Sequence, residues 1–104
     1  MSFRRYEILL PTRYNDGRAV EPEKVDATLM EISARFGGLT FRPEQLIGVW
    51  FHRGNRFEDN HVNLTVDVEE TPETAAFFAR YKETLKERFQ QIEVYIVSYE
   101  VRVT

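Results

Sequence analysis

The sequence predicts an α+β fold whose elements follow the order strand, helix, strand, strand, helix, strand. Two segments carry apolar residues at helical spacing, and each has a proline near its start. The other four segments are rich in alternating, β-branched or aromatic residues, as strands are. A Gly-Asn pair between the second and third of these strands is typical of a hairpin turn. We therefore expect a ferredoxin-like βαββαβ plan, a four-stranded antiparallel sheet with two helices on one face.

The first half of this plan rests on one alternating segment and one amphipathic segment. Residues 3–10 alternate as a strand that Pro11 ends, because proline cannot donate to a ladder. A helix is expected from Pro22 to the Gly37-Gly38 pair, where glycine supplies the left-handed cap. Its apolar stripe recurs at spacings of four, three and four residues, at Val25, Leu29, Ile32 and Phe36.

The second half begins with a hairpin and ends with a helix and a strand. Residues 39–53 and 56–68 form the hairpin, with a bulge or short loop at residues 42–45. Thr71 caps a helix whose buried stripe is Phe78, Tyr81, Leu85 and Phe89. The last strand is expected from about Ile92 to Val103. Its alternation slips, which predicts a bulge near Val97-Ser98.

Length and composition limit the classes of protein to consider. The chain has 104 residues, so we expect residues 1–104 to form a single domain. It contains no cysteine, which excludes disulfides, thiolate metal sites and a cysteine nucleophile. With no secretory signal and no apolar run of ~20 residues, we expect a cytoplasmic protein without a membrane partner. The net charge of −3 predicts no nucleic-acid partner, because such binders carry a surplus of Lys and Arg.

The register of the hairpin decides which side chains face outward. A two-residue turn at Gly54-Asn55 places Ile47, Val49 and Phe51 on one face with the aliphatic residues of 62–68. A three-residue turn would expose those aliphatic residues instead, at about 1.5–3 kcal/mol each. We therefore expect the helices to cover the face of Ile47 and Val62, and Trp50 to point away from them.

The opposite face of the sheet then gathers the candidate functional residues. The candidates for ligand binding or for an interface are Trp50, His52, Tyr95 and Leu9. Large apolar side chains on an open sheet predict contact with another surface or with a ligand. His61 and Asp59 are the catalytic candidates, because two residues ~7 Å apart on one strand face can orient a base or bracket a ligand. The alternative is that they are polar residues of an interface.

Other site types receive less support from the sequence. His52 and His61 are expected to lie ~13 Å apart along the sheet, too far to bind one ion, so no metal or cofactor is predicted. The fold also occurs in RNA-binding domains, but the aromatic pair that would stack bases is missing from the two central strands.

Three stretches together resemble a group of small bacterial proteins carried as a domain of unknown function. They are Arg35-Phe36-Gly37-Gly38-Leu39-Thr40, Gly48-Val49-Trp50, and the segment from Tyr81-Lys82 to Lys86-Glu87-Arg88-Phe89-Gln90. The resemblance implies the fold and a bacterial origin, and it implies no activity.

The sequence leaves three functions open. The leading hypothesis is a small homo-oligomeric binding module, such as a homodimer, that uses its open sheet face. The second is a cofactor-free enzyme or small-ligand carrier with a cavity over Trp50, Asp59 and His61. The third is a regulatory partner of a larger protein.

Overall fold

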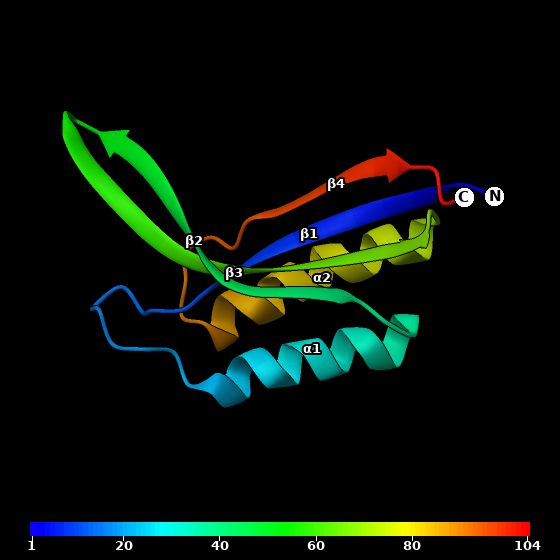
Figure 1. The fold of residues 1–104 in the computed structure, drawn as a ribbon, viewed down its shortest axis with the longest axis horizontal. Helices are drawn as coiled ribbons and strands as arrows, with labels where there is room; N and C mark the ends of the chain where they lie inside the picture. Colours follow the sequence, from blue (N-terminus) through cyan, green and yellow to red (C-terminus); the bar gives the residue numbers. More distant parts are fainter.

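A computed structural model describes all residues from 1 to 104. It contains six elements in the predicted order: β1 (Phe3–Pro11), α1 (Pro22–Phe36), β2 (Thr40–His52), β3 (Asn55–Glu69), α2 (Pro72–Arg88) and β4 (Ile96–Val101). The strands form one sheet in the order β2-β3-β1-β4, and every neighbouring pair is antiparallel. Both helices lie against the same face of the sheet (Figure 1). The predicted ferredoxin-like α+β fold is therefore confirmed.

The hydrophobic core lies between the sheet and the two helices. Tyr6, Ile8 and Leu10 point from β1 into the core beside the aliphatic residues of β3. The whole stripe predicted for α2 is buried: Phe78, Tyr81, Leu85 and Phe89. Tyr6 stacks on Phe78 with ring centroids 3.8 Å apart, so aromatic packing ties β1 to α2.

The predicted helix ends are also confirmed. Gly37 follows α1 with a φ of 88°, and its N–H donates to the carbonyl of Ser33. The hydroxyl of Thr71 accepts from the backbone N–H of Thr74 at 3.1 Å, which caps α2. Both helices are therefore positioned by local signals at their ends.

The hairpin of β2 and β3 turns one residue earlier than predicted. Arg53 and Gly54 form the turn, with φ values of 52° and 80°, and His52 pairs with Asn55. The prediction of a Gly54-Asn55 turn is therefore wrong by one residue. Each residue of β2 in the hairpin pairs with the β3 residue two positions earlier in the chain than predicted. The observed register places Trp50 opposite Phe57, where the rings stack. Because the shift is even, each side chain keeps its predicted face.

The expected interruption of β2 is present as a register shift between Arg42 and Leu46. Arg42 pairs with Asn63 and Leu46 with His61, so three residues of β2 lie opposite a single residue of β3. This excess of two residues preserves the faces of the strand. Beyond it the hairpin rises away from the helices as a curved projection (Figure 1). Residues 46–60 of this projection are called the arm below.

The expectation that the helices cover Ile47 is wrong. Ile47, Val49 and Phe51 share the predicted face, yet they are 61%, 47% and 70% exposed. The cause is a difference in length. A strand of 15 residues, such as β3, extends about 50 Å, whereas helices of 15 and 17 residues reach only about 22–26 Å. The helices therefore cover only the part of the sheet that contains Val62 to Val68.

The last strand is shorter than predicted and has no bulge. β4 pairs with β1 without interruption, from Ile96 opposite Ile8 to Val101 opposite Phe3. Val94 is buried just before the strand begins, whereas Tyr99 lies on the face opposite the helices. The slip in apolar alternation therefore arises because the open face of β4 carries apolar residues of its own.

Candidate functional site

The arm is apolar on both of its faces. Ile47, Val49 and Phe51 lie on the face that continues the helix-covered side of the sheet. Trp50 and Phe57 lie on the opposite face, and both are partly exposed. Exposed apolar groups on two sides of one thin ribbon form the kind of surface that soluble monomers rarely present.

Both edges of the arm also lack a neighbouring strand. β2 is the outer strand of the sheet, so its free edge continues along the whole arm. On the other side, β1 ends at Pro11 opposite His61, and the N–H of Thr12 makes the last contact, with the carbonyl of Asn60 at 3.0 Å. Residues 55–59 of β3 therefore have no strand beyond them. Unpaired strand edges are sites at which another chain can add hydrogen bonds.

Trp50 is held on the open face by two contacts. Its ring stacks on Phe57 across the arm, with centroids 4.4 Å apart and planes 17° from parallel. Its indole N–H donates to Oδ2 of Asp59 at 2.8 Å. The prediction that Trp50 points away from the helices is confirmed, and the ring has a fixed orientation.

His61 lies two residues beyond Asp59 on the same face of β3. Its ring leans over Gly48, where an added Cβ would lie 3.6 Å from Cε1. Gly48 therefore leaves room beside the imidazole. Burial lowers the pKa of His61 below its ordinary value, and the charge of Asp59 opposes this effect only in part. The imidazole is therefore mostly neutral at pH 7, with one nitrogen that donates and one that accepts.

These side chains line a hollow at the base of the arm, called the notch below. Its volume is about 840 Å³, within the range of small-molecule sites. Its walls are the arm, the loop that follows β1, and residues 91–95 before β4. Five of the six candidates from the sequence line it: Leu9, Trp50, Asp59, His61 and Tyr95.

His52 is the candidate that the structure does not bring to this place. It is the last residue of β2, exposed at the tip of the arm beside the turn. Sequence reasoning also missed the loop contribution of Arg13 and Tyr14, which lie on the notch wall. Their only signal is the Asn15-Asp16-Gly17 turn, which folds the loop back so that Arg13 pairs with Ala19.

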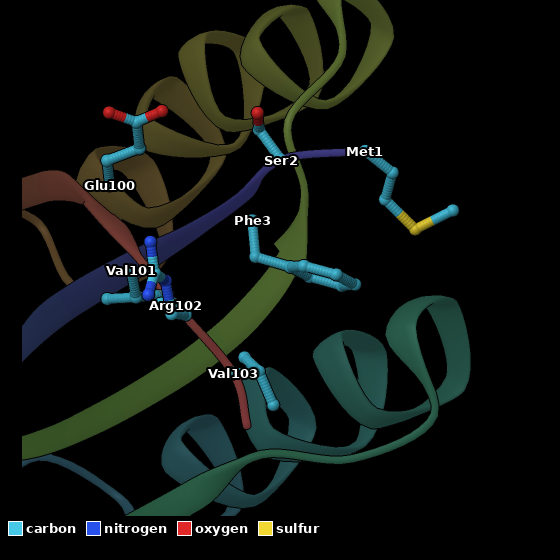
Figure 2. A pocket seen from close by; sticks show the side chains of 7 residues that line it. All are labelled: Met1, Ser2, Phe3, Glu100, Val101, Arg102 and Val103. Carbon is cyan, nitrogen blue, oxygen red and sulfur yellow. The ribbon is translucent and has the colours of Figure 1, made fainter.

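Other parts of the molecule show no comparable convergence of groups. Nowhere do three histidine, aspartate or glutamate side chains gather in a cluster that would hold a metal ion. A second hollow of about 550 Å³ lies where the two ends of the chain meet (Figure 2). In Figure 2 the side chains of Phe3, Glu100 and Val103 point in different directions rather than toward one centre. The notch is therefore the candidate site.

Comparison with known structures finds the same fold in proteins of distant sequence. A phage SAM lyase in complex with S-methyl-5′-thioadenosine superposes with a TM-score of 0.68 at 14% identity, over 98% of this chain and 90% of the other. The divalent cation tolerance protein Cut A1 from Thermus thermophilus superposes with a TM-score of 0.66 at 16% identity, over 98% and 86%. At these identities the likeness shows the fold alone.

No protein-family model matches the chain, and no curated protein matches it. Neither helix has the length and apolar character needed to cross a membrane.

Proposed function

We propose that this protein is a small self-associating binding module in which the arm of one copy packs against another copy. The observation that carries the proposal is the apolar character of both arm faces, on a segment that its own helices do not cover. The two unpaired edges of the arm add backbone hydrogen-bonding groups for a neighbouring strand.

A comparison of the free energy of burial with the cost of association favours an arm that is covered on both faces. Burying Ile47, Val49 and Phe51 contributes at most about 4.5–9 kcal/mol, at about 1.5–3 kcal/mol for each fully buried side chain. Association costs about 4–15 kcal/mol in lost freedom of motion. One face alone therefore barely offsets the cost. Burial of Trp50 and Phe57 on the second face supplies the remaining stabilisation, so the arm is expected to insert between surfaces rather than lie on one.

Sedimentation velocity at micromolar concentrations tests this proposal. Phe51→Glu places a charge in the centre of the buried surface, and we expect it to convert the assembly to monomer. Met30→Glu is the matched control, because Met30 is also an exposed apolar residue, 72% exposed, but lies on α1 away from the arm. Circular dichroism of both variants checks that the fold is kept. A monomeric wild-type protein at high micromolar concentration contradicts the proposal.

A second candidate function is the binding or conversion of a small molecule in the notch. It is supported by the convergence of Trp50, Asp59 and His61 on one hollow of suitable volume. One of the structurally similar proteins, the phage lyase, is in complex with S-methyl-5′-thioadenosine, so a protein of this fold can accommodate a nucleoside. Native mass spectrometry of the purified protein tests for a retained small molecule. Asp59 and His61 are the residues that would act on such a ligand.

A further inference from the structure

We propose that the notch recognises a fused bicyclic heteroaromatic amine, the chemical class of the aminopurines. In this arrangement Asp59 accepts from the ligand's amino group, His61 donates to a ring nitrogen, and the ring lies against the apolar wall at Trp50. The inference rests on the second proposed function, small-ligand binding in the notch. It does not depend on self-association, because every residue that carries it belongs to one chain.

Asp59 has unused capacity to accept hydrogen bonds. Three acidic side chains line the notch, and two are neutralised: Glu58 by Arg56, and Glu93 by Lys82 at 2.9 Å. Asp59 forms no ion pair, and its carboxylate accepts only from the indole N–H of Trp50. An ionised carboxylate has about four acceptor positions. A ligand that donates N–H groups therefore suits Asp59, whereas a ligand that presents a carbonyl there is repelled.

His61 determines the second hydrogen-bonding group that a ligand of the notch must carry. The imidazole forms no hydrogen bond within the chain, and its pKa responds only to burial and to the charge of Asp59. A neutral imidazole donates one hydrogen bond and accepts one. Because Gly48 has no side chain, the ring remains accessible beside β2. The ligand therefore needs a ring nitrogen that accepts at one end and an amine that donates at the other.

The spacing of Asp59 and His61 favours a ligand whose amine and acceptor nitrogen lie on opposite sides of a ring. Asp59 and His61 are two residues apart on one strand, so their Cα atoms are about 7 Å apart and both side chains point to the same face. A ring that carries its amine directly beside its ring nitrogen is too short to engage both groups. In an aminopurine the amine lies across the six-membered ring from N3, and the fused second ring adds apolar area that the notch wall can cover.

The apolar part of the notch matches a flat ring. Trp50 is already fixed by stacking on Phe57 and by Asp59, so little side-chain freedom is lost when a ligand binds. Leu9 and Tyr95 lie on the same lining. Aromatic and aliphatic walls around a few oriented polar groups are typical of small-molecule sites.

Titration of ¹⁵N-labelled protein with adenosine and with inosine tests the inference by NMR. The two nucleosides differ at the six-position, where adenosine has an amine and inosine has a carbonyl. We expect adenosine to cause saturable shifts at residues 46–61, and inosine to bind at least tenfold more weakly. Asp59→Asn is expected to weaken adenosine binding about tenfold while its amide oxygen still accepts from Trp50. Asp26→Asn, the same change on the exposed face of α1, is the control and should bind as the wild type does.

Three results would overturn the inference. Equal affinity for adenosine and inosine would show that Asp59 does not read the amine, although the notch would still be a ligand site. Unchanged adenosine affinity in both Asp59→Asn and His61→Leu would place the binding elsewhere. The absence of saturable shifts with either nucleoside would exclude the purine class. In that last case a different molecule retained in native mass spectra would leave the proposed ligand-binding function standing.

Discussion

The indole ring of Trp50 lies across the arm on the ring of Phe57, 4.4 Å away between centroids, and donates its N–H to Asp59. This relationship links the two proposed roles of the arm. The same ring is an exposed apolar surface of the arm, available to the proposed second copy, and one wall of the notch. A change at Trp50 is therefore expected to affect both self-association and ligand binding, whereas a change at Phe51, on the opposite face, affects self-association alone.

Trp50 is the only tryptophan of the chain, so its fluorescence reports directly on the arm. The ring is partly exposed in the single chain. We expect its emission maximum to move to shorter wavelength as the protein concentration rises through assembly, because the indole loses contact with water. Phe51→Glu should keep the long-wavelength emission at every concentration. An emission maximum in the wild type that is independent of concentration, over a range in which sedimentation shows assembly, would place the interface elsewhere.

The titration of His61 provides a direct test of the notch electrostatics. Burial favours the neutral imidazole and lowers its pKa below the ordinary 6.5, and the negative charge of Asp59 acts in the opposite direction. Asp59→Asn removes that charge, so the pKa of His61 should fall further. NMR titration of the imidazole Cε1 and Cδ2 protons measures the change. A rise in the pKa of His61 in this variant would contradict the geometry of the site.

The elements of the fold follow from local patterns, which is why the sequence predicts them. The stripe of α2 from Phe78 to Phe89 and the Thr71 cap depend only on neighbours along the chain. Predicting that the arm is uncovered requires a comparison of the lengths of strands and helices. Strands of 13 and 15 residues extend well beyond helices of 15 and 17 residues, because the rise per residue is larger in a strand. That comparison needs only the element bounds, so the exposure of Phe51 was within reach of the sequence.

The position of the turn was harder to predict, because two neighbouring glycine-containing pairs compete for it. Gly-Asn at positions 54 and 55 is a common turn pair, whereas Arg53 must adopt a positive φ in the observed turn. The stacking of Trp50 on Phe57 favours the observed register, and this contact exists only after the strands pair. The sequence predicts the correct face for the candidate residues because the hairpin register differs from the predicted one by an even number of residues. It does not predict the loop wall of the notch, because Arg13 and Tyr14 are placed there by tertiary structure.

The strained turn residue provides a stability test. Arg53 and Gly54 both have positive φ, as a type I′ turn requires, and arginine is poorly suited to the first position. Arg53→Asn creates the preferred Asn-Gly pair, and we expect it to stabilise the protein by about 0.5–1 kcal/mol in urea unfolding. Gly54→Ala, with a φ of 80° at that position, should destabilise it by about 1 kcal/mol. A loss of stability in Arg53→Asn would mean that the arginine side chain has a role at the arm tip.

The ion pair between Glu31 and Arg88 should make the stability of the helical layer depend on pH. Arg88 donates to both carboxylate oxygens of Glu31, at 2.7 and 2.9 Å, and also to Thr28, which joins α2 to α1. The guanidinium lowers the pKa of Glu31 below its ordinary 4.5. The pair therefore stabilises the fold fully above that value, and its contribution is lost as the pH falls through the lower pKa of the folded state.

Because Glu31 is half exposed, we expect Glu31→Gln to cost only about 0.5–1 kcal/mol at pH 7. Urea unfolding of the two proteins at pH 7 and at a series of pH values below 4.5 measures the difference, which should shrink as the pH falls because a protonated carboxyl resembles the amide. A difference that stays constant across this range would mean that the variant is destabilised through altered packing rather than through loss of charge. The hydrogen bond from Tyr81 would not explain it, because the glutamine oxygen can also accept that bond.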